Sequence, residues 1–170
     1  RLVELARSCG RTVFTYGEGD GMDVRLNPAA TRHAFGSDFT VTLPDGSKRE
    51  VSIKNNPGRH NMLNATAALT AAYVLGLDTE RAAEALSTFE GARRRFTQVG
   101  EVRGVSLVDD YGHHPTEVRA TLAAAKSLDF QHVDVVFQPH RYSRLQALCD
   151  DFVDAFADAD PVILVDVFPA

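Results

Sequence analysis

The stretch VSLVDDYGHHPTEVRATLAAAKSL, residues 105–128, decides the fold class because it passes from strand to loop to helix. VSLVD is a short apolar run, typical of a buried strand. After the polar loop, Val118, Leu122 and Ala125 recur at helical spacing, so they define one apolar face. Pro115 suits a first helical turn, and His114 can cap it. The stretch therefore predicts a strand followed by an amphipathic helix.

The same alternation continues toward the carboxyl end. VDVVFQ (133–138) is a second apolar run, LQALCDDFVDAF (145–156) has helical spacing, and PVILVDV (161–167) is a third apolar run. The inward face of this second helix is predicted to hold Leu145, Leu148, Cys149, Phe152 and Phe156. A β-α-β-α-β order predicts an α/β domain with a parallel sheet.

The preceding part of the chain has a different pattern. DFTVTL and REVSI flank PDGS, and their alternation predicts a hairpin with one buried face, formed by Phe39, Val41, Leu43, Val51 and Ile53. A helix is predicted from Arg59 to Gly76, and a second one capped by Thr79, with Phe89 on its inner face. We expect a domain boundary near Thr97, giving domains 1–97 and 98–170.

Composition restricts the class of protein. The 170 residues are 44% hydrophobic and 24% charged, which is typical of a folded globular protein. A net charge of −5 argues against nucleic acid as a partner. No apolar stretch is long enough to predict membrane insertion, so we expect a cytoplasmic protein. Cys9 and Cys149 lack metal-site spacing and are expected to be reduced thiols.

Two polar loops follow predicted strands. Ligands of open α/β sheets bind beyond the carboxyl ends of the strands, so we expect DYGHHP (110–115) and PHRYSR (139–144) at one rim. Arg141 and Arg144 would stand at the start of a helix, where the helix dipole disfavours cations unless an anion is bound. The first loop and the end of its strand crowd together titratable groups beyond what capping requires, namely Asp109, Asp110, Tyr111, His113 and His114.

A further polar group opens the Ala-rich helix. Asn61 and Asn64 share a helical face and could read the edge of a base, although helix capping explains such residues equally well. Arg93–Arg95 is either a solvated charge run or a phosphate contact. The chain has neither GxxxxGK[ST] nor GxGxxG, so it contains no loop of the kind that cradles phosphates.

Several of these stretches together carry a family resemblance. In chain order they are PGRHNMLNATAAL (57–69), FEGARRRF (89–96), VDDYGHHPTEV (108–118), VFQPHRYSR (136–144) and DVFPA (166–170). The sequence resembles the Mur ligases of peptidoglycan synthesis, most of all the members that act on UDP-N-acetylmuramate and L-alanine. The resemblance implies that 1–97 is the latter part of a central ATPase domain. It also implies that 98–170 is the first part of a Rossmann-like carboxyl-terminal ligase domain, and that domains of the same protein lie upstream.

The resemblance also implies a reaction and its residues. ATP and Mg²⁺ would phosphorylate the lactyl carboxylate of UDP-N-acetylmuramate, and the amine of L-alanine would attack the acyl phosphate. The nucleotide would be bound by His60, Asn61 and Asn64 at adenine, Asp110 at ribose and Arg95 at the phosphates. L-alanine and the reacting group would be surrounded by Tyr111, His113, Arg141 and Arg144, of which His113, Arg141 and Arg144 would be catalytic. The resemblance identifies no metal ligand.

Three alternatives stay open. One is a murein tripeptide ligase of cell-wall recycling. Another is a non-catalytic fragment, because the expected P-loop is missing from the chain. From the residues alone, a metal-dependent hydrolase could use Asp109, Asp110, His113 and His114.

Overall fold

The computed structural model describes residues 1–33, 35–54, 56–128 and 130–169. The chain divides into two compact units. Unit 1 comprises 1–32, 37–53 and 61–89, and unit 2 comprises 33–36, 54–60 and 90–170. Each unit has its own buried hydrophobic cluster.

Unit 1 contains a four-stranded sheet in the order β1-β2-β3-β4. The strands are β1 (Tyr16–Gly17), β2 (Val24–His33), β3 (Gly36–Thr42) and β4 (Lys48–Ile53). The predicted hairpin is confirmed, since β3 and β4 pair antiparallel with Phe39 opposite Val51. Its predicted inner face is buried, at 0–5% exposure. Burial of these apolar side chains stabilises the hairpin against the helices that cover it.

Strand β2 was not predicted from the sequence. Val24 and Leu26 alternate and are buried at 0% and 1% exposure, but Pro28 follows them. Proline lowers the expectation of a strand because it cannot donate to a ladder. The segment is nevertheless a strand, because it pairs with β3 on one side and in parallel with β1 on the other.

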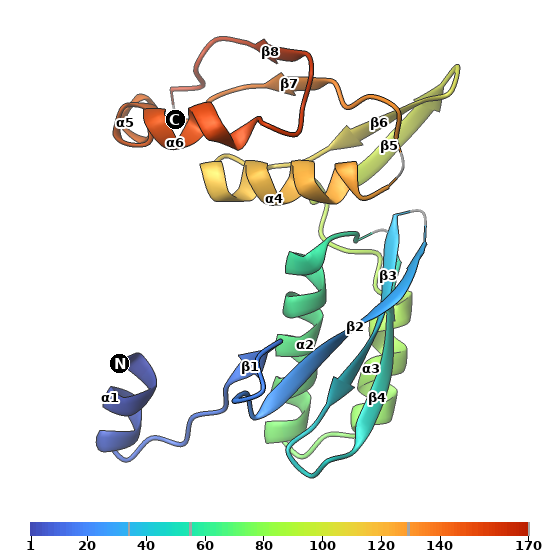
Figure 1. Cartoon of the computed structure of the whole chain (residues 1–170), viewed down its shortest axis with the longest axis vertical. Coiled ribbons are helices and arrows are strands. Elements are labelled where there is room, and N and C mark those ends of the chain that lie inside the picture. The colour runs from blue at the N-terminus through green and yellow to red at the C-terminus, as the bar shows by residue number, and fades with distance from the viewer. Residues whose placement is uncertain (34, 55, 129, 170) are drawn as a thin grey trace. The chain divides into compact units, whose positions relative to one another are not determined.

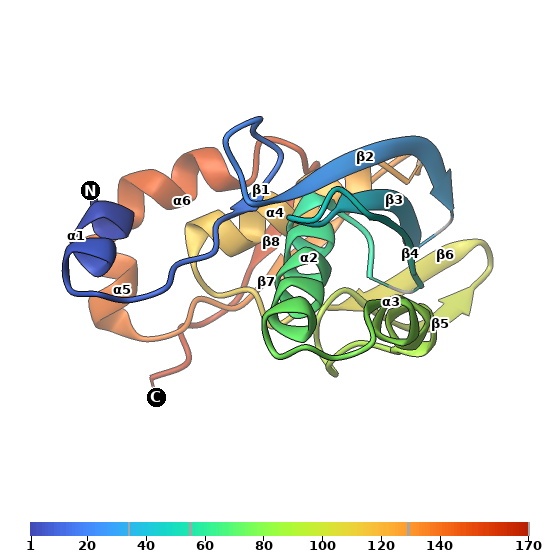
Figure 2. The same ribbon diagram turned by 90° about the horizontal axis from the view of Figure 1, so that it is seen from below.

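Two helices, α2 (Arg59–Val74) and α3 (Thr79–Thr88), cover one face of this sheet (Figures 1 and 2). Ala65 and Leu69 of α2 and Ala83 of α3 join the strands in one cluster. The predicted cap of α3 was wrong by one residue. Asp78 caps the helix through Glu80 N and Arg81 N, because the Thr79 hydroxyl already accepts a hydrogen bond from Arg49 Nε.

Two termini of helices in unit 1 expose apolar side chains. Phe89 was predicted on the inner face of α3 but lies beyond its last residue and is exposed. α1 (Leu2–Ser8) has no buried residue and stands away from the sheet, joined to it by an extended segment (Figure 1). In the described parts of the chain, no helix is both long enough and apolar enough to cross a membrane.

Unit 2 begins with an unpredicted hairpin. β5 (Thr97–Val102) pairs antiparallel with β6 (Val105–Asp109). The connecting residues Arg103 and Gly104 both have positive φ, 53° and 80°, as the tight turns of two-residue hairpins require. This corrects the prediction that VSLVD is a buried strand of a parallel sheet. Among the described residues β6 pairs only with β5, and Val105 and Leu107 are exposed.

The rest of unit 2 follows the predicted α/β pattern. β7 (Val135–Phe137) and β8 (Val162–Leu164) pair in parallel, and α5 (Tyr142–Ala147) and α6 (Cys149–Ala155) connect them. α4 (Pro115–Lys126) packs beside α6 (Figure 1). The shared core consists of Val118, Leu122, Phe137, Phe152 and Ala155. The Phe137 ring centroid lies 5.5 Å from that of Phe152 and 5.1 Å from that of Phe156.

The helix predicted over residues 145–156 is broken into two. Leu148 has φ −123° and ψ 22°, so it ends α5 and precedes α6. Leu145, Leu148, Phe152 and Phe156 pack against the core as predicted. Cys149 does not, because the break turns it to the surface, and the prediction of a core thiol is wrong.

Candidate functional site

The loops that follow β6 and β7 lie together within unit 2. The ring centroid of His140 is 6.1 Å from that of Tyr111 and 5.7 Å from that of His113. The predicted proximity of the two loops is therefore confirmed. Its predicted cause was wrong in part, because β6 belongs to the hairpin and not to the β7–β8 sheet.

Asp110 fixes the conformation of the first loop. Its Oδ2 accepts a hydrogen bond from Phe96 N at 2.8 Å, and its Oδ1 accepts one from Gly112 N at 2.7 Å. A Cβ at position 112 would lie 2.7 Å from Oδ1, so only glycine allows this contact. Tyr111 N donates to Arg94 O at 2.8 Å. The loop is thereby tied to the segment before β5.

The amino end of α4 orients both histidines of the loop. His114 is the cap, and its Nδ1 accepts from Thr116 N at 3.3 Å, as predicted. Glu117 Oε2 accepts from His113 N at 3.0 Å and from His114 N at 3.2 Å. Partial burial alone would raise the pKa of Glu117. The two amides and the charges of His113 and Arg95 outweigh it and lower that pKa.

The His113 ring has a defined tautomer. Its Nδ1 lies 2.9 Å from Tyr111 O and 3.7 Å from Glu117 Oε2. A carbonyl oxygen can only accept, so Nδ1 carries a proton. This leaves Nε2 as the nitrogen available to a ligand.

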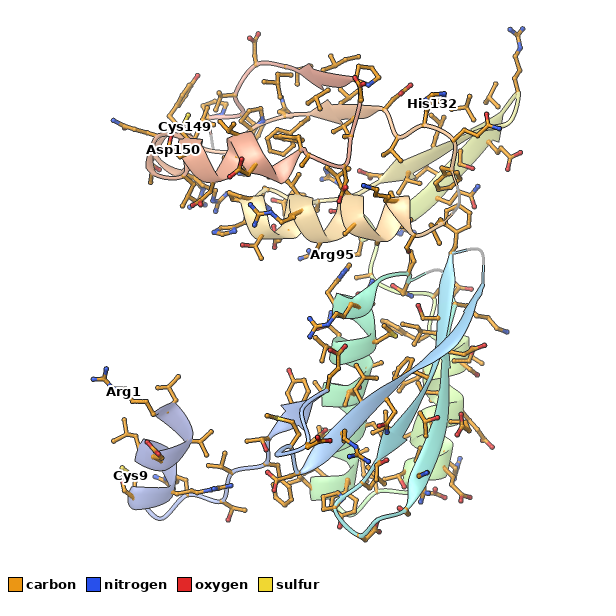
Figure 3. All side chains as sticks on the ribbon, viewed as in Figure 1. Arg1, Cys9, Arg95, His132, Cys149 and Asp150 are labelled. Carbon is orange, nitrogen blue, oxygen red and sulfur yellow. The ribbon has the colours of Figure 1, made fainter. Side chains whose placement is uncertain are left out.

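Two of the three consecutive arginines contact this loop region. Arg94 Nε lies 3.4 Å from Asp109 Oδ2, and the guanidinium carbon lies 4.8 Å from the Tyr111 ring centroid. Arg95 Nη1 lies 3.8 Å from Glu117 Oε1, and Figure 3 shows its side chain beside α4. Such exposed pairs hold their partners weakly, so both guanidiniums can take up an anionic ligand.

His140 was missed in the sequence analysis, although it lies in the quoted PHRYSR. Its ring stacks on Phe168 with centroids 5.0 Å apart and planes at 26°. Partial burial first, and then the charges of His113, Arg144, Arg141 and Arg94, lower the pKa of His140.

The second loop is bound to the segment after β8. Arg141 N donates to Phe168 O at 2.9 Å, and Phe168 N donates to Pro139 O at 2.8 Å. Arg144 Nη1 donates to His140 O at 3.4 Å. Arg141 has φ 68°, a conformation that costs a non-glycine residue about 1 kcal/mol or more and is concentrated at functional sites.

His60 belongs to the same unit as these loops. Burial lowers its pKa, the charge of Asp110 opposes that shift and the charge of Arg95 adds to it. Asn61 and Asn64 lie in unit 1, where Asn64 Nδ2 donates to Asn61 Oδ1 at 3.4 Å, so the two amides share a face as predicted. His60 therefore belongs to the same unit as Asp110 and Arg95, and the two asparagines belong to unit 1.

The metal-site alternative does not fit the geometry. In the described ranges, no three His, Cys, Asp or Glu side chains are grouped so that they could hold a metal ion. Asp109 pairs with Arg94, Asp110 accepts from backbone amides, and His114 caps α4. A metal-dependent hydrolase built on Asp109, Asp110, His113 and His114 is therefore contradicted.

Comparison with known sequences gives the same relationship for most of the chain. Residues 94–169 match the family model of the Mur ligase, glutamate ligase domain. The UDP-N-acetylmuramate–L-alanine ligase of Rhodopseudomonas palustris (strain TIE-1) is 47% identical over 165 residues. That alignment covers 94% of this chain, and the chain spans 35% of the length of that relative.

Solved structures show the same similarity. The UDP-N-acetylmuramate-alanine ligase MurC of Thermotoga maritima has a TM-score of 0.75 and 28% identity, covering 91% of this chain and 34% of that one. A murein peptide ligase from Psychrobacter arcticus 273-4 has a TM-score of 0.60 and 25% identity, covering 95% of this chain and 35% of that one. The chain belongs to the Mur ligase family.

Proposed function

We propose that this chain is part of an ATP-dependent ligase that joins L-alanine to the lactyl carboxylate of UDP-N-acetylmuramate. The reaction would serve peptidoglycan precursor synthesis in the cytoplasm. Residues 1–97 would form the latter part of the central ATPase domain, and 98–170 the first part of the carboxyl-terminal ligase domain. The observation that carries the proposal is the meeting of the Tyr111–His113 loop with the His140–Arg144 loop. The name of the 47% identical relative supports the same substrates.

On the nucleotide side of the site, Asp110 and Arg95 can each bind a ligand in addition to their partners in the chain. Each Asp110 carboxylate oxygen accepts one backbone N–H and retains a lone pair for a ribose hydroxyl. The Arg95 guanidinium, which forms a 3.8 Å ion pair with Glu117, would contact the phosphates. His60, Asn61 and Asn64 would border adenine. In the described ranges no three His, Cys, Asp or Glu side chains form a group that could hold a metal ion, so no residue is assigned to Mg²⁺.

The acceptor side is cationic in a chain whose net charge is −5. When bound, ATP supplies the phosphoryl group that activates the lactyl carboxylate as an acyl phosphate. Arg141 and Arg144 would hold the carboxylate of L-alanine and the phosphoryl oxygens, because guanidinium groups bind both in bidentate geometry. His113 would donate toward the reacting oxygen, and Tyr111 would border the amino acid. Fixed positive charge lowers the energy of the anionic transition state without reorganisation.

Two other readings remain distinguishable by experiment. The similarity to the murein peptide ligase supports a recycling enzyme whose acceptor is a tripeptide. The lack of a phosphate-cradling loop in these 170 residues supports a binding role when the chain is produced alone. Calorimetry of the 170-residue chain with ATP would measure that binding directly.

The proposal is tested by measuring ADP release. The assay uses a full-length protein that contains this chain and is as long as the relatives. We expect ADP only when UDP-N-acetylmuramate and L-alanine are both present. ADP formation with a tripeptide and not with L-alanine would favour the recycling enzyme. If ADP forms neither with L-alanine nor with the tripeptide, both ligase proposals are contradicted.

A variant of the acceptor side sharpens the test. Arg141→Ala should raise the KM for L-alanine by about a hundredfold, because a hydrogen-bonded charge is lost. Arg81→Ala, on the exposed face of α3, removes the same charge elsewhere and should leave KM unchanged. An unaltered KM in Arg141→Ala would remove that residue from the acceptor site.

A further inference from the structure

We propose that His140 accepts the proton that the amino group of the incoming amino acid must lose before it attacks the acyl phosphate. The inference rests on the proposed function and assigns a chemical role to a residue that the sequence analysis did not select. Its basis is the position of the ring among the groups of both loops.

The reaction requires such a proton acceptor. An α-amino group is an ammonium ion at neutral pH and has no lone pair to form a bond. In the step proposed, the amine nitrogen forms a C–N bond to the acyl carbon. The ammonium proton first passes to an imidazole nitrogen, which frees the lone pair that forms this bond. The C–O bond to phosphate then breaks and its electron pair leaves with the phosphate, which also takes the second proton that the nitrogen loses as it becomes the amide. A positioned base of this kind typically contributes about 10²–10⁴-fold to the rate.

The other candidate bases near the arginines are already engaged. Asp110 accepts two backbone hydrogen bonds, and Glu117 accepts two and has a lowered pKa, which makes it a weak base. His113 Nδ1 lies 2.9 Å from Tyr111 O and 3.7 Å from the Glu117 carboxylate, so this nitrogen donates to the carbonyl oxygen and is not available to accept a proton. These three side chains can therefore position the loop and the substrate, but they are poor proton acceptors.

His140 has the opposite environment. It is faced by His113 and Tyr111 from the first loop and by Arg94 from the segment before β5. Arg141 just before α5, Arg144 within α5 and Phe168 after β8 complete its surroundings. Partial burial, and after it the neighbouring cations, lower the pKa of His140, so its imidazole is neutral at neutral pH and can accept a proton. Within the described part of the chain, neither ring nitrogen has a hydrogen-bond partner.

The placement also suits the substrate. The carboxylate and the amino group of an α-amino acid are attached to one carbon. An amino acid whose carboxylate is held by Arg141 and Arg144 therefore presents its ammonium group near the residue that precedes Arg141. The Arg144 guanidinium already donates to the backbone oxygen of His140, so the two side chains share one short segment.

The test compares two nucleophiles in the full-length protein carrying His140→Gln. L-Alanine needs to be deprotonated, whereas hydroxylamine is largely neutral at pH 7 and traps the acyl phosphate as a hydroxamate. We expect L-alanine ligation to fall about a hundredfold or more, and hydroxamate formation to stay within about threefold of wild type. The retained hydroxamate also shows that the variant is folded and activates the carboxylate.

The pH profile gives a second readout. In wild type, kcat for L-alanine should decline as the pH falls through the pKa of His140, which lies below its ordinary value of 6.5. His140→Gln should lose this limb, and its rate should instead rise with the fraction of free amine. His132→Gln is the matched control, because His132 is exposed and lies at the opposite end of unit 2 from Cys149 and Asp150 (Figure 3).

Each contrary result has a distinct meaning. Equal losses with both nucleophiles would make His140 a structural residue, and no loss with L-alanine would make it dispensable. Either result overturns the inference while the ligase proposal stands. If wild type forms no hydroxamate from UDP-N-acetylmuramate and ATP, the proposed function fails, and the role of His140 fails with it.

Discussion

Glu117 shows how one side chain holds the loop in place. Its Oε2 accepts from two successive amides, and its other oxygen faces Arg95. The side chain is 35% exposed, so solvent screens its charge and its contribution to stability is moderate. The lowered pKa means that the ionised carboxylate stabilises the folded state.

We predict that Glu117→Gln lowers the free energy of unfolding at pH 7 by about 1 kcal/mol or less. The sign follows from linkage. The folded pKa lies below the ordinary 4.5, so the stabilisation is complete above that value and is lost as the pH falls through the folded pKa. Urea unfolding at pH 7 and near pH 3 should therefore show the difference between wild type and variant shrinking at the acid value. A constant or growing difference would mean that the charge of Glu117 does not stabilise the loop.

Gly58 is a position where backbone conformation and space act together. Its φ is 99°, and an added Cβ would lie 2.9 Å from Ala124 Cβ and 3.0 Å from His60 Cε1. Gly104 has a similar φ of 80°, but nothing lies within 4 Å of an added Cβ. The pair separates the cost of positive φ from the cost of a steric clash.

Gly104→Ala should lower stability by about 1 kcal/mol, the cost of placing a side chain at positive φ. Gly58→Ala should cost about 2–4 kcal/mol, because Ala124 on α4 and the His60 ring must also shift. Thermal or chemical unfolding of both variants measures the difference. Equal costs would show that Gly58 is not packed closely on α4.

At the level of elements, the break between α5 and α6 determines whether the Cys149 thiol is buried or exposed. A continuous helix would carry Cys149 into the core with Phe152, whereas the bend at Leu148 places it on the surface. Cys9, after α1, is also exposed. Figure 3 shows the two cysteines on separate elements.

Titration of the native 170-residue chain with a thiol reagent should therefore modify both cysteines rapidly, without denaturant. The Cys9→Ser variant should retain one rapidly reacting thiol. Slow reaction of that remaining thiol until denaturant is added would indicate an unbroken helix over 145–156. Thiol-free Cys9→Ser/Cys149→Ser protein provides the baseline.

At the level of the whole molecule, the two units have separate cores. Phe39 is fully buried among side chains of unit 1, and Phe152 is 7% exposed among those of unit 2. Because removing a buried phenyl ring costs about 3–5 kcal/mol, each substitution should act mainly on its own unit.

Native-state hydrogen exchange can resolve the two units. Phe39→Ala should lower the protection of amides in α2 and α3 and leave that of α4 unchanged. Phe152→Ala should lower the protection of α4 and α6 and leave α2 unchanged. Loss of protection throughout the chain in either variant would show that the two cores unfold as one.

The sequence by itself determined the elements whose signals are local. The β3–β4 hairpin, helix α2, the inner face of α4, the His114–Pro115 start of α4 and the parallel β7–β8 pair all follow from spacing and turn chemistry. Motif resemblance added the family. The rule for strand ends predicted that the two polar loops meet, although β6 belongs to the β5–β6 hairpin and not to the β7–β8 sheet. These features depend on residues that are near one another in the chain or on fixed topology.

Tertiary structure decided what depends on distant partners. The two-residue turn at Arg103–Gly104 pairs β6 with β5 instead of with a strand of the parallel sheet. An apolar run alone does not reveal which strand it will pair with. The same reason explains β2, the exposed Cys149 and above all His140. The character of that imidazole comes from Arg94, His113 and Phe168, which reach it from three other segments of the chain, so no local pattern could have marked it.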